Sequence, residues 1–162
     1  MEVMSEVSAI DESEWALWRD FAVMHNELAR ELDRRLQRDA GISQGDYAVM
    51  LTLFNAPDRR LRPGALGEEI GWEKSRLSHQ LTRMVSRGLV ERVECDTDGR
   101  GTFVVLTRAG RRALLASMRD HALAIRTLFL DLLEPDEKRA IADVSARVLA
   151  RLADESDERA AG

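Results

Sequence analysis

The stretch LGEEIGWEKSRLSHQLTRMVSRGLVER, residues 66–92, decides the fold. It continues a short apolar segment that Pro63 opens, because proline fits the first position of a helix. Gly71 favours the end of that helix, since glycine tolerates the left-handed conformation there. A helical pattern resumes at residue 74 and stops at Gly88. Two short helices joined by a brief turn that contains glycine are typical of a helix-turn-helix.

The second of these helices, residues 74–87, is predicted to have two different faces. At about 100° per residue, one side gathers the apolar Leu77, Leu81, Met84 and Val85. The other side has no acidic member and consists of Ser75, Arg76, His79, Thr82, Arg83 and Ser86. Residues 71–92 carry five basic and two acidic side chains, whereas the whole chain has a formal net charge of −5. Local positive charge in an acidic chain indicates contact with a polyanion, although a charge run alone also suits a solvated helix face.

The pattern changes from helix to strand after Gly88. Residues 89–95 alternate apolar and polar side chains, and residues 102–106 are rich in β-branched ones. The turn-rich DTDGRG lies between them, so we expect a β-hairpin, the wing of a winged helix. Arg100 stands between two glycines at the hairpin tip and can enter a narrow minor groove. The alternative, for this residue alone, is an arginine on a solvated loop.

Long helices are expected on both sides of this winged domain. Apolar side chains recur at three- and four-residue steps through residues 12–39, and again in helices that Thr107 and Pro135 open. Their apolar surface exceeds what a small winged domain can cover, which indicates a helical dimer interface. The expected fold is therefore mainly α with a small β-hairpin wing. Its parts are a dimerisation helix (12–42), a winged helix-turn-helix (43–106), C-terminal dimerisation helices (107–154) and a frayed tail (155–162).

Composition excludes several other classes of protein. No apolar run is long enough for a transmembrane helix, and the acidic N-terminus does not resemble a secretory signal. A single cysteine, Cys95, suits a reducing cytoplasm. The three histidines are scattered, and the chain lacks an HExxH, a CxxC pair and a P-loop. We therefore expect a cytoplasmic protein that is not an enzyme, with no cofactor, no metal site and no membrane contact.

Double-stranded DNA is the partner that best explains the face without acids. Arginine can bond guanine in the major groove, and serine and threonine can bond bases or phosphates. N-terminal residues of a recognition helix reach base edges, so we assign Ser75, Arg76, His79 and Gln80 to bases and Arg83 and Arg87 to phosphates. Lys74 and Thr82 complete the predicted contacts of this helix. The alternative is a winged helix that contacts another protein and does not bind DNA.

These motifs resemble the MarR (multiple-antibiotic-resistance regulator) family. The helix-turn-helix stretch, the DGR of the wing and the LTRAGR that opens a long helix carry the likeness, which extends over residues 15–152. The resemblance implies a homodimeric winged-helix repressor that binds an inverted-repeat operator. It also implies that Arg100 enters the minor groove and that Asp98 holds neighbouring basic residues. Wings of the family often carry further basic residues where this chain has Gly99 and Gly101, which predicts weaker DNA binding.

The resemblance further implies a small-molecule pocket between the dimer helices and the winged domain. Its effectors would be anionic phenolic or lipophilic compounds. The residues that could line it are Trp15, Trp18, His25, Tyr47 and Phe54, although all five also suit a core or an interface. Cys95 lies between Glu94 and Asp96, which favours an inert thiol over an oxidant sensor. The operator, the regulated genes and the effector do not follow from the sequence.

Overall fold

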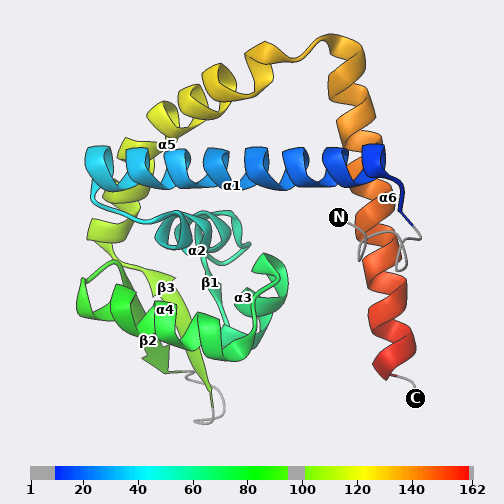
Figure 1. Cartoon of the computed structure of the whole chain (residues 1–162). Coiled ribbons are helices and arrows are strands. Elements are labelled where there is room, and N and C mark those ends of the chain that lie inside the picture. The colour runs from blue at the N-terminus through cyan, green and yellow to red at the C-terminus, as the bar shows by residue number, and fades with distance from the viewer. Residues whose placement is uncertain (1–9, 95–100, 161–162) are drawn as a thin grey trace. The chain divides into compact units, whose positions relative to one another are not determined.

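The computed structural model describes residues 10–94 and 101–160, and the backbone alone for residues 157–160. The chain forms two compact units, and the division between them falls after His121 in the sequence. The first unit holds, in chain order, α1 (Glu12–Ala40), α2 (Gln44–Asn55), β1 (Arg60–Leu61), α3 (Pro63–Ile70), α4 (Lys74–Ser86), β2 (Val90–Glu94) and β3 (Thr102–Leu106) (Figure 1). Helix α5 (Arg108–Leu128) begins in the first unit and ends in the second, which also holds the short 3-10 helix η2 (Leu130–Leu132) and α6 (Pro135–Ala160).

The helices of the winged domain begin and end as the sequence predicts. Ser43 and Asp46 form a capping box at the start of α2, in which each side chain accepts from the other's backbone N–H. Pro63 occupies the first turn of α3. Gly71 and Gly88 follow α3 and α4 with φ of 72° and 67°, a region that glycine adopts without the steric cost of a Cβ. The helix-turn-helix and the fold class are therefore confirmed.

The sheet has one strand more than the predicted hairpin. Strands β2 and β3 pair antiparallel from Val90↔Leu106 to Glu94↔Thr102, as expected. The two-residue strand β1 adds to the other side of β3, with Arg60 opposite Val105. Strand β1 was not predicted from the sequence, because two residues cannot show an alternating pattern.

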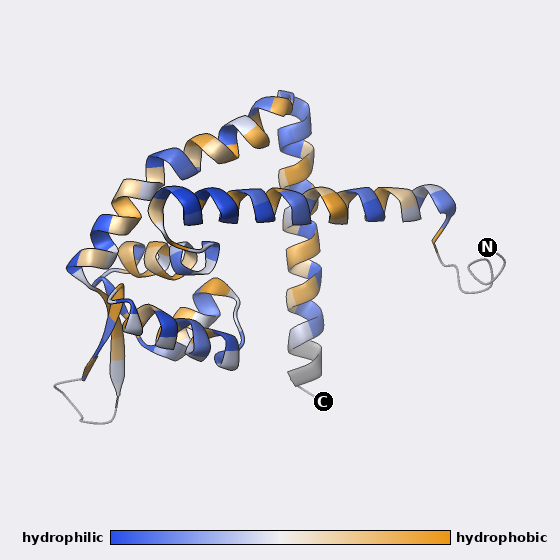
Figure 2. Cartoon of the chain, turned by 60° about the vertical axis from the view of Figure 1, so that its left-hand side comes forward, coloured by the Kyte–Doolittle hydropathy of each residue, from blue (hydrophilic) through white to orange (hydrophobic). Residues whose placement is uncertain are grey.

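The core of the first unit lies between α2, the helix-turn-helix and the sheet. Its fully buried side chains come from each of these elements and from the start of α5, and they include Met50, Leu53, Leu66, Leu81, Met84, Val104 and Leu114. In Figure 2, which is coloured by hydropathy, α2 is mostly hydrophobic, whereas the C-terminal half of α1 is mostly hydrophilic. Val85 departs from the prediction that it packs inward, since it is 41% exposed. At about 80° from Leu77 it lies at the edge of the apolar face.

A close contact joins the end of α4 to the start of α5. The hydroxyl of Thr107 donates to the carbonyl of Gly88 at 2.6 Å and accepts from the backbone N–H of Gly110 at 3.0 Å. Thr107 therefore caps α5, as predicted. A Cβ on Gly110 would lie 1.9 Å from the carbonyl oxygen of Leu89, so only glycine fits there without movement. This contact is the physical reason for the glycine in the LTRAG stretch.

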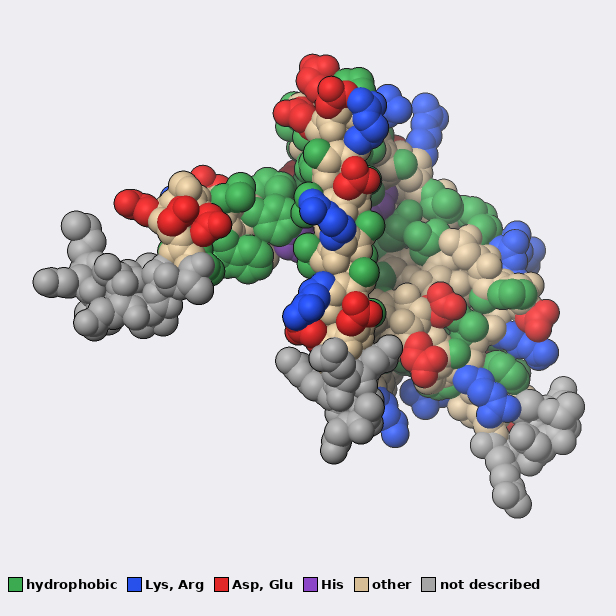
Figure 3. Space-filling model, turned by 90° about the vertical axis from the view of Figure 1, so that its right-hand side faces the viewer, with side chains coloured by type: hydrophobic (Ala, Val, Ile, Leu, Met, Phe, Trp, Pro, Cys, Tyr) green, Lys and Arg blue, Asp and Glu red, His purple; other side chains and the backbone are tan. Residues whose placement is uncertain are grey.

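The second unit exposes a continuous apolar face. Along α6, Ile141, Val144, Val148 and Leu152 recur at three- and four-residue steps and are each at least 40% exposed in the single chain. Figure 3 shows hydrophobic side chains among the charged ones on α6. Helix α6 runs on to Ala160, through residues expected to form a frayed tail. Within the described ranges, no helix combines the length and the hydropathy that crossing a bilayer requires.

Candidate DNA-binding interface

Helix α4 places the predicted DNA-contacting side chains on one open face. Leu77, Leu81 and Met84 point into the core and anchor the helix. The side chains of the opposite face are exposed, namely Lys74, Ser75, Arg76, His79, Thr82 and Arg83. None of these six is acidic, so the face combines positive charge with short polar groups.

Arg76 lies against the turn of the helix-turn-helix. Its guanidinium carbon is 4.2 Å from the ring centroid of Trp72, a cation–π contact. Trp72 is half-buried and also approaches Gly45 of α2, where an added Cβ would lie 3.3 Å from the indole ring. The stacked ring limits the directions in which Arg76 can extend from α4.

Gln80 takes a different place from the base contact that we predicted. It is only 6% exposed, and its amide nitrogen donates to Asp46 Oδ1 at 2.7 Å. A side chain buried in this way is not available to a base edge while the helix keeps its present packing. Its partner lies 34 positions earlier in the chain, so sequence spacing could not indicate the contact.

Arg87, predicted as a phosphate contact, also binds Asp46. Its guanidinium donates to Asp46 Oδ2 at 2.6 Å and to the carbonyl of Gly41. The Asp46 side chain is 1% exposed and that of Arg87 43%. Burying a lone carboxylate is costly, so Arg87 compensates a buried charge whether or not it also reaches a phosphate.

The first turn of α4 offers unused backbone donors. The caps of α1 and α2 are acidic or hydroxyl side chains that bond back to the helix, as in the box of Asp11 and Glu14. In α4 the cap is Glu73, whose side chain makes no such bond, and the first turn has no acid. The first N–H groups of a helix attract anions, and here the exposed carboxylate of Glu73 lies beside them without bonding to them.

The hairpin tip lies outside the described residues, and with it Asp98, Arg100 and Cys95. The base of the hairpin has cations that the sequence analysis did not assign to the site. Arg60 lies on β1, and Arg62 directly follows this strand. Their guanidinium carbons lie 4.7 Å and 5.4 Å from the ring centroid of Phe103 on β3. These two cations reach the wing through β1, a strand too short for the sequence to reveal.

The residues predicted to bind an effector do not form one site in the first unit. Trp18, Phe21 and His25 lie in a row along the exposed N-terminal half of α1, with neighbouring ring centroids 6.3 Å apart. Trp15 is also exposed on this half, which Figure 3 shows covered with hydrophobic side chains. Tyr47 is buried on α2, and Phe54 stacks with Arg59, 4.1 Å from the guanidinium carbon.

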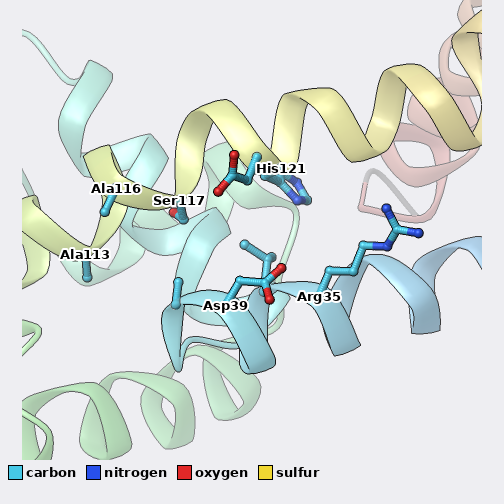
Figure 4. Close-up of a pocket in the computed structure, with 9 residues that line it drawn as sticks. Arg35, Asp39, Ala113, Ala116, Ser117 and His121 are labelled. Atoms are coloured by element: carbon cyan, nitrogen blue, oxygen red, sulfur yellow. The ribbon is translucent and has the colours of Figure 1, made fainter.

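A cavity of about 100 Å³ lies between the C-terminal end of α1 and α5. Figure 4 shows Arg35 and Asp39 from α1 facing Ser117 and His121 from α5. His121 is 6% exposed, and its ring lies 4.4 Å from that of Tyr47 between centroids, with the two planes tilted by 52°. Its Nδ1 has no hydrogen-bond partner among the described residues. Burial lowers the pKa of His121 and raises the pKa of Tyr47, because it disfavours the charged form of each.

Across residues 10–94 and 101–160, no three His, Cys, Asp or Glu side chains lie where they could hold a metal ion. The first unit therefore contains a helix-turn-helix with a β wing, and the second helix of the helix-turn-helix presents a cationic face.

Comparison with known proteins gives the family of this winged helix. The sequence profile of the MarR family matches residues 40–101. AbsC, a MarR family transcriptional regulator from Streptomyces coelicolor, is 30% identical, with 91% of this chain and 99% of that chain covered and a TM-score of 0.84. Sco3205, a second regulator of the family from the same organism, solved in complex with DNA, is 33% identical, with 88% and 93% covered and a TM-score of 0.83. The chain belongs to the MarR family of transcriptional regulators.

A further structural match is PcaV, a transcriptional regulator from Streptomyces coelicolor solved in complex with its natural ligand. It is 25% identical, with 89% of this chain and 98% of that chain covered and a TM-score of 0.69. A search of curated protein sequences gave no match.

Proposed function

We propose that this protein is a homodimeric repressor that binds an inverted-repeat operator in double-stranded DNA and releases it when a small molecule binds. It would act in the cytoplasm and catalyse no reaction. The observation that carries the proposal is the exposed face of α4, which holds Lys74, Arg76 and Arg83 and no acid. A surface helix without a polyanionic partner would normally alternate acids and bases.

The proposed contacts follow from where each side chain lies. Ser75, Arg76 and His79 occupy the N-terminal half of the exposed face, the part of a recognition helix that reaches base edges. Arg83 lies two turns after Arg76 on the same flank and would meet a phosphate. Arg100 would enter the minor groove from the hairpin tip, next to Asp98. The relative Sco3205, solved in complex with DNA, supports DNA binding by this chain.

The proposed dimer uses the apolar surfaces that the single chain leaves exposed. On α1 these include Leu17, Trp18 and Phe21, and on α6 Val144 and Val148. A monomeric protein rarely exposes contiguous apolar patches of this kind. We therefore assign residues 12–42 and 107–154 to dimerisation and residues 43–106 to DNA binding.

The proposed effector is a small anionic phenolic or lipophilic compound, as the family resemblance implies. The similar regulator PcaV, solved in complex with its natural ligand, supports the presence of an effector. Trp15, Trp18 and His25 on the exposed half of α1 would meet it once a second subunit covers them. Tyr47 and Phe54 would contribute from α2. A panel of phenolic acids, screened by the shift in thermal unfolding temperature, tests this part. A flat response across the panel would count against an effector of this class.

The first experiment is selection of fragmented genomic DNA with the purified protein at near-physiological salt. Enrichment of an inverted repeat, with half-sites about one helical turn apart, would support the proposal. The affinity of the selected duplex should then fall when Arg76 or Arg83 is changed to Ala. Loss of a phosphate contact should also lower the slope of log K against log salt by about 0.9. If no duplex is retained, a winged helix that contacts another protein becomes the better account.

A further inference from the structure

The buried side chain of Gln80 points from the recognition helix to the start of α2. Its amide nitrogen donates to Asp46 Oδ1 at 2.7 Å. An added Cβ on Gly45 would lie 3.3 Å from both Cδ and Oε1 of Gln80, so the backbone of α2 closes over this amide. The amide is therefore held on two sides by α2.

The carboxylate of Asp46 decides which way round that amide lies. Its Oδ2 accepts from the backbone N–H of Ser43 at 2.8 Å and from Arg87 at 2.6 Å, and Oδ1 accepts from Gln80. An ionised carboxylate accepts hydrogen bonds and cannot donate them. Gln80 must therefore turn its NH₂ group toward Asp46, and its carbonyl oxygen faces away.

That carbonyl oxygen meets the cationic face of α4. Arg83, one turn further along the helix, donates from its guanidinium to Gln80 Oε1. Arg83 is exposed, whereas Gln80 and Asp46 are buried. A fixed donor and acceptor order thus runs from the buried carboxylate, through the amide, to an exposed guanidinium.

We propose that Asp46 and Gln80 are positioning residues for DNA recognition, which hold Arg83 in the orientation in which it meets the operator. The inference rests on the proposed DNA binding through α4. It changes the role predicted for Gln80, which acts on DNA through Arg83 and does not touch a base. A long arginine side chain loses rotamer freedom when it binds, so holding it beforehand lowers the entropic cost of the contact.

The test is a double-mutant cycle on the full-length protein, with Kd measured on a selected operator duplex. Gln80→Met keeps the length of the side chain and removes its acceptor for Arg83. We expect Gln80→Met and Arg83→Ala each to weaken binding by about five- to tenfold. The double variant should bind no more weakly than Arg83→Ala alone, since both changes remove the same contact. The control cycle pairs Gln80→Met with Arg76→Ala, whose effects should multiply, because Arg76 stacks on Trp72 and not on Gln80.

A salt titration separates this role from a merely structural one. If Gln80→Met displaces Arg83 from a phosphate, the slope of log K against log salt should fall by about 0.9 although no charge has been removed. A loosened fold would lower affinity without this change in slope. Asp46→Asn provides a second variant, because an asparagine can present a donor to Gln80 and allow its amide to turn over. It should interact with Arg83→Ala in the same way.

The outcomes distinguish this inference from the proposed function. If the wild-type protein binds no duplex, or binds one that is indifferent to both Arg76→Ala and Arg83→Ala, the proposed function fails. A different result overturns only the positioning role. In that case Arg83→Ala weakens DNA binding by the same factor in the wild-type protein and in the Gln80→Met variant, and the proposed DNA binding stands.

Discussion

Gly110 packs so closely against the backbone that a side chain does not fit there. An added Cβ would lie 1.9 Å from the backbone oxygen of Leu89, and backbone cannot rotate away as a side chain can. We expect Gly110→Ala to lower the free energy of unfolding by about 1–3 kcal/mol, the usual cost of forcing a methyl group into a packed site. Urea denaturation measures this loss. Gly64→Ala is the matched control, because nothing lies within 4 Å of its added Cβ and alanine favours a helix; a loss as large at Gly64 would contradict the steric explanation.

His121 predicts a dependence of stability on pH. Burial holds its pKa in the folded chain below the ordinary value of 6.5, so the unfolded chain binds the proton more readily. The contribution of the neutral imidazole is therefore complete above about pH 6.5 and is lost as the pH falls below that value toward the folded pKa.

Thermal unfolding from pH 8 to pH 5 should show a smaller loss of stability for His121→Phe than for the wild-type protein. Phenylalanine keeps an aromatic ring against Tyr47 and removes the titrating group. His79→Gln is the control for replacing a histidine, since His79 is exposed on α4 and lies outside the proposed dimer surfaces. Identical profiles for His121→Phe and the wild type would show that another group causes the dependence.

For single residues, the sequence predicts the exposed face of α4 well and the location of the Gln80 side chain poorly. Ser75, Arg76 and His79 are exposed as expected, because helical periodicity alone places them opposite Leu77. Gln80 lies only about 60° from Leu77 on the helix, so its position on the helix indicated burial in the core. Its polar side chain indicated exposure to solvent instead. The buried carboxylate that decides the question belongs to α2, and no local pattern in α4 contains it.

At the scale of elements, the start of α2 supports both the fold and the recognition helix. The hydroxyl of Ser43 accepts from the backbone N–H of Asp46 at 3.0 Å. We expect Ser43→Ala to lower the free energy of unfolding by about 1 kcal/mol, the typical contribution of a helix cap. Chemical denaturation of the full chain measures it.

Ser78→Ala provides the comparison, because the exposed Ser78 side chain makes no hydrogen bond in the part of the chain that the structure describes. It should change stability little. Equal losses for Ser43→Ala and Ser78→Ala would mean that the cap contributes nothing beyond a general effect of replacing serine.

Elements with clear start and stop signals were predictable from the sequence, and the shortest element was not. Pro63, Gly71 and Gly88 mark ends of α3 and α4 through local backbone preferences. Strand β1 exists only because β3 offers an edge for Arg60 and Leu61 to pair with. Pairing between distant segments leaves no periodic trace in two residues, so the cations beside the wing were missed with the strand.

For the whole molecule, the exposed apolar face of α6 predicts that assembly can be broken at one position. Val148→Glu would place a charge in the centre of the proposed dimer interface, where burying it is costly. We expect the mass measured by light scattering to fall from that of a dimer to that of a single chain. Asp143→Lys is the control and should remain dimeric, because Asp143 is exposed and lies about 140° around α6 from Val148.

Loss of the dimer should also weaken binding to a full inverted repeat by about 100-fold or more, because the second half-site no longer binds at high effective concentration. Binding to an isolated half-site should be nearly unchanged. A dimeric Val148→Glu protein would show that α6 is not the interface.

The fold class of the whole chain was predictable because each motif of the winged domain lies within a short stretch of sequence. The wide apolar stripes of the flanking helices also indicated that surface remains to be covered. Which surfaces meet was not predictable, because an exposed Trp18 or Val148 has the same sequence signature as a core residue. The five residues proposed to bind an effector illustrate this, since the structure distributes them between an exposed helix and a buried one.

The face of α4 contains two kinds of side chain, and they should differ in how freely they can change over evolutionary time. In the described part of the chain, Ser75 and His79 make no side-chain hydrogen bond, so replacing them would cost the fold little. Arg83 is linked through Gln80 to Asp46, and a change there disturbs the start of α2 as well. A descendant that acquires a new target sequence should therefore vary at residues 75 and 79 first and keep residues 46, 80 and 83 together as an inherited set.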